Sequence, residues 1–562
     1  MNKRFKQFFS LFLSAVMIFT VFAGCSKNEK LIDFIYPFSA NVNSYDPQVA
    51  STADEFLIIE NTFEGLVRTL DDGTVVKGCA ESWDISKDGL TYTFHIKRGL
   101  KWNIDHDKYT EGENKGKFKD ERLRLLGRDF DPDITANDFI FALRRAVSPE
   151  TNSPLFASVS AIKNAVKIHS GKLSADKLGV AAKDAYTLTV SLSSPDGDFL
   201  QTLSSAVAMP CNAEFFNATG GRYGLETKYT LFNGQFYLSQ ILESSYLLKR
   251  NKFYNGPSPA NAGELTLKIP DESSNTVELL QKGYYDAAFI TGYESSKLTK
   301  AKGISYIPYE DTTWAFLFNT ANEVFQSKTM RKAFCTGLSE YSGSKKYLNA
   351  AKTLTPRSCT IGGAPSAEKT GSTVLTPNTE ESIRLWEKGL KVINETDITI
   401  TIITPKTMQD EVRALLQGIQ SGIGTVVKNS EGEPMTFTIK VEPLEDAELK
   451  TRVLTRNYDL AFYPFVSTSD SAEAFLDTFT ENSYTGFNTD KLEKALTSAV
   501  KATDKATEAA FIKQAENEII GTYSIYPAIY ETSYYAAANG VKNIQFHAGT
   551  GRVSFVNATR KE

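Results

Sequence analysis

The sequence predicts an α/β fold of two lobes, and three observations support this prediction. Residues 265–290 contain a strand pattern, a short helical pattern and a buried apolar strand in that order, and residues 398–441 repeat the order with clearer alternation. Two βαβ units this far apart in one chain are typical of two α/β lobes. The chain of 562 residues is also long enough for several domains, and its 41% hydrophobic and 23% charged residues are ordinary for a globular protein.

The charge and the motifs of the chain argue against several classes of function. Its 62 basic and 67 acidic residues give a net charge of −5, so the charge does not favour nucleic acid as a partner. The four histidines are scattered, no spacing fits a metal site, and no nucleophile elbow or phosphate-binding loop is present. Gly422-Ile423-Gly424 follows a helical pattern, so we interpret it as a helix stop. We expect no cofactor, no metal and no catalytic residue, although an enzyme whose catalytic residues meet only in the fold stays open.

The N-terminus predicts export and lipidation. Residues 1–24 are predicted to be a secretory signal, because three basic residues precede the apolar run 8–22. This run is shorter than the ~20 residues that a membrane-spanning helix needs. It is followed by Ala23-Gly24-Cys25, which resembles a bacterial lipobox, so Cys25 is the predicted lipidation site and residues 25–31 a tether to the membrane. A plain signal peptide with an incidental cysteine is the alternative.

Four other cysteines are present, namely Cys79, Cys211, Cys335 and Cys359. An exported protein can form disulfides. However, each of these cysteines stands alone in apolar or mixed sequence, so we expect buried free thiols. If one bridge forms, Cys335 with Cys359 is the first candidate.

The elements of the first hundred residues follow from periodicity. A strand is predicted at residues 31–36, before the turn signal Asn43-Ser44-Tyr45-Asp46-Pro47. A helical segment follows near residue 60, the chain turns at residues 71–73, and residues 91–96 alternate like a half-buried strand.

A polar segment and a helix come next. Residues 106–132 are rich in charge and have too little apolar content for a core of their own, so a surface loop is expected. Thr135 or Asn137 can cap the helix that follows, which ends before Ser148-Pro149. Residues 186–192 alternate as a further strand.

The order of several short motifs carries a family resemblance. These motifs are Phe63-Glu64-Gly65-Leu66, Asp72-Gly73, Ala80-Glu81-Ser82-Trp83, the segment 88–94, Lys101-Trp102, Met209-Pro210, the segment 232–238, the segment 314–320, the segment 330–334 and the segment 523–530. In this order the chain resembles the family 5 solute-binding proteins of ABC importers. That family includes receptors for oligopeptides, dipeptides, nickel complexes and some sugars.

The resemblance implies a fold and a division into domains. It implies a two-lobed periplasmic-binding-protein-like fold of type II, in the large peptide-receptor subclass with an extra subdomain, and a ligand cleft between the lobes. The implied parts are 32–65, 206–313 and 528–562 for the core of lobe I, 66–205 for the extra subdomain with its inserted loop near 106–132, and 314–527 for lobe II.

The resemblance also implies a function. The expected protein is a monomeric lipoprotein on the extracytoplasmic face of the cell membrane. It captures a small solute, with a peptide as the leading class, by closure of its lobes and delivers it to the membrane-spanning subunits of an ABC permease. A sugar, a modified peptide or another neutral ligand stays open, and so does a sensory lipoprotein of the same fold that binds a signal peptide.

The implied ligand-binding residues are Ser51, Ala53, Phe141, Ile290, Phe462, Phe465, Thr468 and Asp470. Thr468 stands where peptide receptors of the family carry an aspartate that pairs the ligand ammonium, and Asp470 could replace that aspartate. Phe462, Phe141 and Ile290 stand where arginine, tyrosine and asparagine occur in the family. The alternatives are a core position for Phe462 and a solvated turn or helix cap for Asp470. For Glu55, which lies close to Ser51 and Ala53, the alternative is a charge at a helix N-terminus.

Overall fold

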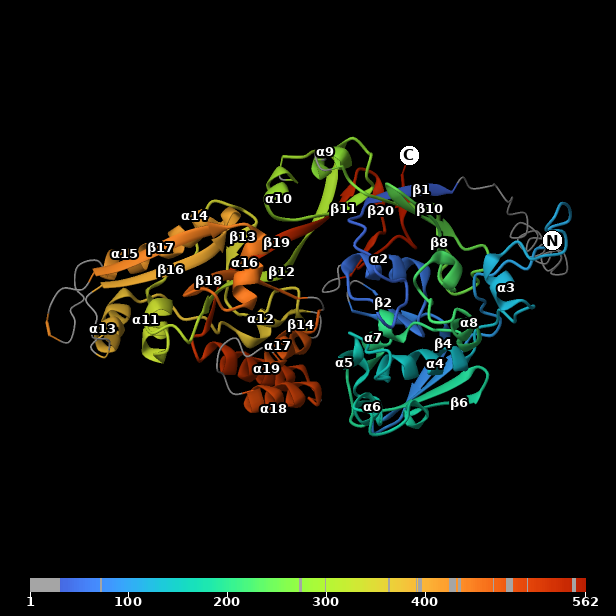
Figure 1. The fold of residues 1–562 in the computed structure, drawn as a ribbon, viewed down its shortest axis with the longest axis horizontal. Helices are drawn as coiled ribbons and strands as arrows, with labels where there is room; N and C mark the ends of the chain where they lie inside the picture. The colour runs from blue at the N-terminus through green and yellow to red at the C-terminus, as the bar shows by residue number, and fades with distance from the viewer. Residues whose placement is uncertain are drawn as a thin grey trace, which may run out of the picture.

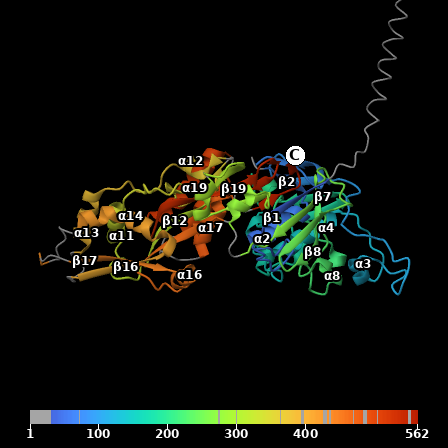
Figure 2. The same cartoon turned by 90° about the horizontal axis from the view of Figure 1, so that it is seen from above.

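The structure is a computed structural model that describes residues 31–561 apart from 71–72, 272–274, 299, 362–363, 391, 393–396, 424–430, 433–435, 468–469, 482–488, 503 and 548–551. It shows two lobes side by side, which we call the first and the second lobe (Figure 1). The first lobe holds the N-terminal elements and the C-terminal strands β20–β23, and the second lobe holds α11–α19. The view from above shows the same elongated arrangement (Figure 2).

The first lobe is built on a four-stranded sheet. Its strand order is β1 (Ile32–Pro37), β10 (Ala262–Lys268), β9 (Ser245–Arg250) and β8 (Phe236–Leu242). β1 pairs with β10 in parallel, and the other pairs are antiparallel. The predicted strand at residues 31–36 is therefore confirmed.

The C-terminal strands form two short antiparallel pairs, of which β22 packs against α2 (Ala53–Thr62). The four strands are β20 (Val541–Lys542), β21 (Gln545–His547), β22 (Arg552–Ser554) and β23 (Thr559–Arg560). Asn61 of α2 donates to the Val553 carbonyl at 2.7 Å and accepts from the Phe555 N–H at 2.9 Å. The last residues of the chain therefore complete the first lobe.

A second sheet in this lobe has the order β4 (Ala80–Ile85), β5 (Thr91–Ile96), β7 (Thr187–Ser191) and β6 (Val180–Asp184). α4 (Ala136–Val147) packs against β6 and β7. Thr135 and Asp138 form a capping box at its start, and the helix ends before Ser148-Pro149. The expected strands at 91–96 and 186–192 and the expected helix are confirmed.

Shorter elements complete the first lobe. They are β2 (Val67–Thr69), β3 (Val75–Lys77), α5 (Phe156–Val159), α6 (Ala165–His169), α7 (Phe199–Thr202), α8 (Ala213–Ala218), α9 (Thr276–Gln281) and α10 (Gly292–Leu298).

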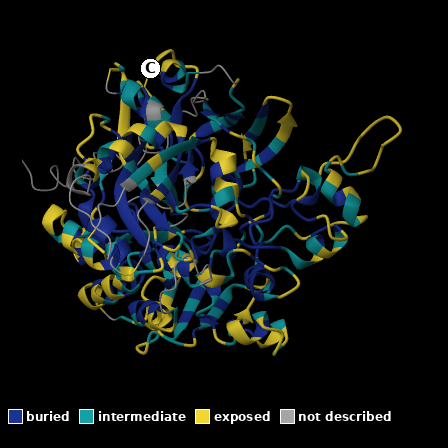
Figure 3. Cartoon of the chain, turned by 60° about the vertical axis from the view of Figure 1, so that its left-hand side comes forward, coloured by how far each residue is buried: buried dark blue, intermediate teal, exposed yellow. Residues whose placement is uncertain are grey.

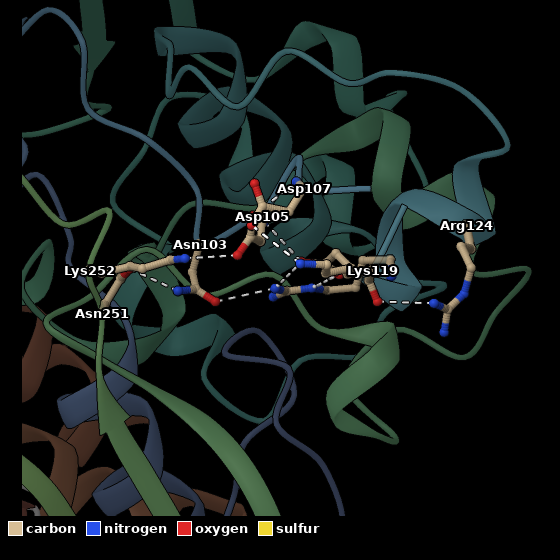
Figure 4. Close-up of polar contacts among 9 residues, drawn as sticks. Asn103, Asp105, Asp107, Lys119, Arg124, Asn251 and Lys252 are labelled. Carbon is tan, nitrogen blue, oxygen red and sulfur yellow. Dashed lines mark hydrogen bonds and ion pairs between the residues drawn. The ribbon is translucent and has the colours of Figure 1, made fainter. Parts of the chain in front are cut away.

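The charge-rich segment 106–132 projects from the first lobe but is ordered. Residues 108–117 are exposed and form a hairpin closed by the Lys108–Phe118 bridge. A polar network fixes its base, in which Lys252 contacts Asp105 at 2.8 Å and the Asn103 side chain donates to that of Asn251 at 2.8 Å (Figure 4). The surface-loop prediction is confirmed for the hairpin, but it missed α3 (Glu121–Leu126).

A seven-stranded sheet forms the centre of the second lobe and reaches into the first lobe through β11 and the adjoining ends of β12 and β19. Six strands follow the order β11 (Ala287–Ile290), β19 (Ile525–Ala538), β12 (Ile304–Phe318), β18 (Leu460–Val466), β16 (Asp397–Pro405) and β17 (Thr436–Leu444), and β13 (Leu348–Ala350) also pairs with β19. Figure 3 shows buried residues, in dark blue, concentrated in the interior and exposed ones, in yellow, on the outer elements.

Helices cover both faces of this sheet. One face packs on a core with α11 (Lys328–Gly337), α13 (Thr379–Leu390), α14 (Gln409–Leu415) and α15 (Gln417–Ile423). The other packs on α16 (Asp446–Leu454), α17 (Ala472–Glu481), α18 (Thr489–Val500) and α19 (Lys505–Ile520). Trp314 of β12 belongs to the core that includes α11, and its neighbour Ala315 belongs to the core on the opposite face, which includes α19. Successive residues of a strand point to opposite faces of the sheet, as seen here. The short elements β14 (Thr360–Ile361), β15 (Ala364–Pro365) and α12 (Ser366–Thr370) complete this lobe.

The two predicted βαβ units differ in their pairing. β16 and β17 pair in parallel with α14 and α15 between them, which confirms the second unit. In the first unit the strands and the helix exist, but β10 and β11 are not hydrogen-bonded neighbours. β1 pairs with β10, and its residue Ile35 accepts a backbone hydrogen bond from Asp286, just before β11. β1, which comes from far away in the sequence, therefore lies between β10 and the start of β11.

Two long antiparallel strands, β12 and β19, join the lobes. Tyr309 and Tyr535 belong to the core of the first lobe, whereas Trp314 and Ile529 belong to the core of the second. The pairing shifts by one residue between Tyr309 and Thr312, which marks a β-bulge where the chain passes from one core to the other.

The four cysteines within the described residues are buried and free. Cys335 lies in the core on one face of the second-lobe sheet and Cys359 in the core on the other, so the sheet separates the two candidates for a bridge. The expectation of free thiols is confirmed. The predicted signal, Cys25 and the start of the tether lie outside the described residues. Over the described part of the chain, no helix combines the length and apolarity that crossing a membrane requires.

Candidate functional site

Two contacts among the described residues connect the lobes. The first is the hinge, where β12 and β19 cross. The second is an ion pair in which Lys505, at the start of α19, lies 3.5 Å from Asp198, just before α7. Figure 1 shows α7 and α19 on different lobes. Lys505 also contacts Glu508 at 2.8 Å within the second lobe.

On the first lobe, the predicted residues Ser51 and Ala53 are exposed where α2 begins. Glu55 holds this segment in place, because its carboxylate accepts backbone hydrogen bonds from Asn43, Ser44, Ser51 and Thr52. Burial favours a higher pKa for Glu55, but these N–H donors lower the pKa below its ordinary value. Glu55 forms a capping box with Thr52, so its interpretation as a charge at a helix N-terminus is confirmed.

Two further predicted residues pack inside the first lobe. Phe141 is half-buried on α4 and meets the edge of Phe216, with ring centroids 5.4 Å apart. Ile290 ends β11 and is fully buried in the core. In this conformation Ile290 has no surface that a ligand can touch.

On the second lobe, the predicted residues lie on β18 and just after it. Phe462 is fully buried and stacks on Trp314 at 5.7 Å, which confirms its alternative interpretation as a core residue. Phe465 is half-buried and packs against Phe479. Asp470 is exposed, and its carbonyl accepts from the Thr360 N–H at 2.9 Å. Thr468 lies outside the described residues.

The bulge in β12 places two acidic residues, Glu310 and Asp311, at the hinge. Glu310 is paired, since its carboxylate lies 3.2 Å from Arg357 and accepts from the Thr532 hydroxyl at 2.7 Å. Asp311 accepts only from the neighbouring Thr312 hydroxyl, at 2.8 Å, among the side-chain hydrogen bonds of the described residues. Sequence reasoning missed this pair, although two adjacent acidic residues within an otherwise apolar strand are a readable signal.

Burial is the main cause of an altered pKa at this site. It raises the pKa of Asp311 to about 6, with a smaller contribution from the negative charge of Glu531 and against the Thr312 hydrogen bond. Glu531 lies opposite Thr312 on β19 and accepts from the Trp314 indole N–H at 2.8 Å. The hinge thus carries more negative than positive charge.

This arrangement is suited to binding a polar or cationic solute between aromatic and acidic side chains. Within the described ranges, no group of histidine, cysteine and acidic residues could hold a metal ion. The fold and the site together define a two-lobed binding protein.

The comparison with protein families identifies its class. The model of the bacterial extracellular solute-binding proteins, family 5, matches residues 74–487. The chain belongs to this family, which confirms the resemblance seen in the sequence. Proteins of this family bind solutes, so the expectation that the chain is a binding protein and not an enzyme is also confirmed.

Individual relatives and solved structures agree with this assignment. The chain is 24% identical to the dipeptide-binding protein DppE of Bacillus subtilis over 570 aligned residues, which cover 97% of each protein. Its fold is similar to that of Listeria monocytogenes OppA bound to peptide, with a TM-score of 0.69, 20% identity and coverage of 95% of this chain and 100% of the other. It is also similar to the Escherichia coli murein tripeptide binding protein MppA, with a TM-score of 0.68, 20% identity and coverage of 95% and 99%.

Proposed function

We propose that the protein is the substrate-binding component of an ABC importer, which captures a peptide outside the cytoplasm and delivers it to a permease. The observation that carries the proposal is the hinged pair of lobes in a chain that belongs to the solute-binding family. A ligand that touches both lobes stabilises the closed state over the open state by its contacts with both. The permease then distinguishes the loaded from the empty receptor by this shape.

Peptide is the ligand class with the most support. The similar proteins are named as binding proteins for dipeptides, oligopeptides and a murein peptide. The site offers what a peptide needs, namely half-buried aromatic surface at Phe465 and carboxylates at the hinge. A neutral sugar would bring no positive charge to this acidic hinge, where Glu310 is paired with Arg357 but Asp311 and Glu531 are also acidic.

We further propose which residues touch the ligand. Ser51 and Ala53 would contact it from the first lobe, Phe141 would support that wall, and Phe465 and Asp470 would contact it from the second. Ile290 and Phe462 would act from the core behind these surfaces. Thr468, two residues before Asp470, completes the predicted set.

The proposed cellular position rests on the N-terminal sequence. Cleavage before Cys25 and lipidation of its thiol would attach a monomeric receptor to the outer face of the cell membrane, with a short tether before β1. Mass spectrometry of the protein purified from its host checks this, because it should show a diacylglycerol adduct on residue 25. An unmodified N-terminus at another position would contradict the anchor.

The function is tested by binding and uptake together. The mature protein should bind peptides in calorimetry, and a deletion strain should lose uptake of the peptides that bind. Binding of a sugar with no peptide binding would contradict the ligand class. Unchanged uptake together with a lost cellular response would favour a sensory lipoprotein.

A further inference from the structure

Acidic side chains from both lobes lie around one lysine where α7 meets α19. Asp198 of the first lobe and Lys505 of the second lie 3.5 Å apart. The same lysine lies 2.8 Å from Glu508, one turn further along α19. Glu473, at the start of α17, is close enough to feel the charges of both Glu508 and Asp198. Three carboxylates from two lobes therefore surround one ammonium group.

This contact lies away from the hinge. Figure 1 shows α7 of the first lobe facing α17 and α19 of the second, below the region where β12 and β19 pass between the lobes. When two lobes rotate about a hinge, groups far from it separate the most. Glu473, Glu508 and Lys505 move together on the second lobe, whereas their distance from Asp198 changes with the rotation.

The acids differ in how much water surrounds them. The Asp198 side chain is 61% exposed, whereas that of Glu508 is 8% exposed and Glu473 is half-buried. Water and salt screen exposed charges well and buried ones much less. The repulsion that Asp198 brings on closure therefore acts mainly on the two enclosed glutamates.

This repulsion alters how tightly the glutamates bind protons. Burial raises the pKa of Glu473 and that of Glu508, and the charge of Asp198 raises both further. Hydrogen bonds act in the opposite direction, from the Ser471 hydroxyl to Glu473 at 2.9 Å and from Lys505 to Glu508. Those hydrogen bonds lie within the second lobe, so closure adds the contribution of Asp198. Each glutamate therefore binds a proton more tightly in the closed state than in the open state.

Protonation also changes the partner of Lys505. Its ammonium lies nearer to Glu508 than to Asp198, at 2.8 Å against 3.5 Å, so the two carboxylates compete for it. Burial favours a lower pKa for Lys505, but these carboxylates raise the pKa above its ordinary value, so the lysine stays charged. A neutral Glu508 leaves the lysine to Asp198, which strengthens the contact between the lobes.

Other titratable groups beside the contact do not produce this effect. Burial and then the charge of Asp198 raise the pKa of Asp196, but Lys505 lowers it, so the arrival of Lys505 on closure opposes protonation there. Tyr92 donates to the Asp196 carbonyl, and burial raises its pKa. Burial also raises the pKa of the Cys359 thiol, near Glu473, to about 12. Neither Tyr92 nor Cys359 titrates in the acidic range.

We propose that Asp198, Lys505, Glu473 and Glu508 form a latch that favours the closed state more strongly as the pH falls. The inference rests on closure, which is part of the proposed function, and it uses no residue assigned to the ligand. Because the closed state binds more protons than the open state, the ratio of closed to open protein rises as the pH decreases from 7.5 toward the ordinary glutamate value of 4.5. The gain is lost when the pH rises again.

The test measures the distance between the lobes in ligand-free protein by pulsed electron paramagnetic resonance. Spin labels are attached at Val166→Cys and Val500→Cys, because both valines are exposed, one on α6 and the other at the end of α18. Figure 1 shows these helices at the lower ends of the two lobes. The protein starts at residue 26, so Cys25 takes up no label, and the other four cysteines are buried. From pH 7.5 to 5.0 the ratio of closed to open protein should rise about two- to fivefold.

Three variants assign this rise to the latch. The double variant Glu473→Gln with Glu508→Gln should show at pH 7.5 the ratio that the labelled parent reaches at pH 5.0, and should respond little to pH. Asp198→Asn changes an exposed side chain and should remove the rise. Glu226→Gln is the matched control and should keep it, because Glu226 is an exposed carboxylate paired with Lys228 inside the first lobe.

The outcomes separate the latch from the proposed function. The same ratio at pH 7.5 and 5.0 would overturn the latch and leave peptide capture intact. A rise that persists in Asp198→Asn would do the same, because it would assign the effect to another group. A label distance that stays the same when a peptide shown by calorimetry to bind saturates the protein would contradict closure itself, and the proposed mechanism of capture with it.

Discussion

Two glutamates are fully enclosed in the protein and carry hydrogen bonds that organise it. Glu64 accepts from the Tyr254 hydroxyl at 2.6 Å and from Gln235 at 3.3 Å. Glu516 of α19 accepts from the backbone of Leu354 and from the Thr373 hydroxyl. Burial raises the pKa of each to about 7, despite these donors.

The first prediction concerns the effect of pH on stability. The folded pKa of Glu64 lies above its ordinary value of 4.5, so between these values the folded state binds more protons than the unfolded state. The free energy of unfolding should therefore fall as the pH rises from about 4.5 to 7. Glu64→Gln should reduce this fall by about 1–3 kcal/mol in urea denaturation at pH 5 and pH 7.5.

Glu121→Gln serves as the control for this prediction, because the Glu121 side chain is 61% exposed. It should leave the pH dependence as it is in the wild type. The same slope for wild type and Glu64→Gln would contradict an enclosed, protonated Glu64.

At this scale the sequence could predict residue types but not their surroundings. The sequence allows Phe462 to be either a ligand contact or a core residue, and only its packing on Trp314 shows that it lies in the core. The pair Glu310 and Asp311 was missed because its contacts, Arg357 for Glu310 and Ser467 for Asp311, lie far away in the sequence. Glu55 was recognised because its partners are within about twelve residues.

Among the elements, a buried ion pair connects the turn after β1 with α4. Arg145 contacts Asp46, and both side chains are more than nine-tenths buried. The Arg145 guanidinium also donates to Gln48 at 2.7 Å and lies over the Phe216 ring. This contact fixes the loop that leads to the exposed start of α2.

The second prediction concerns how much this ion pair contributes to the free energy of unfolding. Arg145→Ala should lower the free energy of unfolding by about 3–5 kcal/mol, because it leaves the Asp46 carboxylate buried without its partner. Denaturation in urea measures the change. The control, Arg128→Ala, removes an ion pair whose arginine is 68% exposed and should cost less than ~1 kcal/mol. Similar losses in the two variants would contradict the role given to burial.

Elements were predictable where the signal is local. β5, β7, β16 and β17 show clear alternation, and α4 has both a cap and a proline stop. Strand partners were not predictable in the same way, since β11 pairs with β19, nearly 250 residues later. α3 was missed because its six residues are too few to establish a helical period.

For the whole molecule, the contact between Lys505 and Asp198 indicates how closure is favoured. Asp198 of the first lobe lies near Glu473 and Glu508 of the second, and its charge helps to raise the pKa of both after burial, the main cause. Lys505 contacts Asp198 and Glu508, and so reduces the repulsion between these acids across the two lobes.

The third prediction concerns a variant in which the charge of Lys505 is reversed. Lys505→Glu should weaken ligand affinity by about two- to fivefold, because it adds repulsion only when the lobes are closed. The loss should shrink at 0.5 M salt through screening, and Asp198→Lys should restore affinity in the double variant. Affinity that does not change with either substitution would show that this contact contributes nothing to closure.

The arrangement as two lobes was predictable from two separated α/β units and the order of the family motifs. The relative position of the lobes was not, because it depends on the hinge of β12 and β19 and on side chains that meet only in the fold.

The most direct test of capture by closure is small-angle X-ray scattering of the mature protein with and without a tightly bound peptide. The radius of gyration should decrease on binding, as the lobes rotate toward each other about β12 and β19. An identical scattering profile for the empty protein and the saturated complex, with binding shown independently by calorimetry, would contradict it.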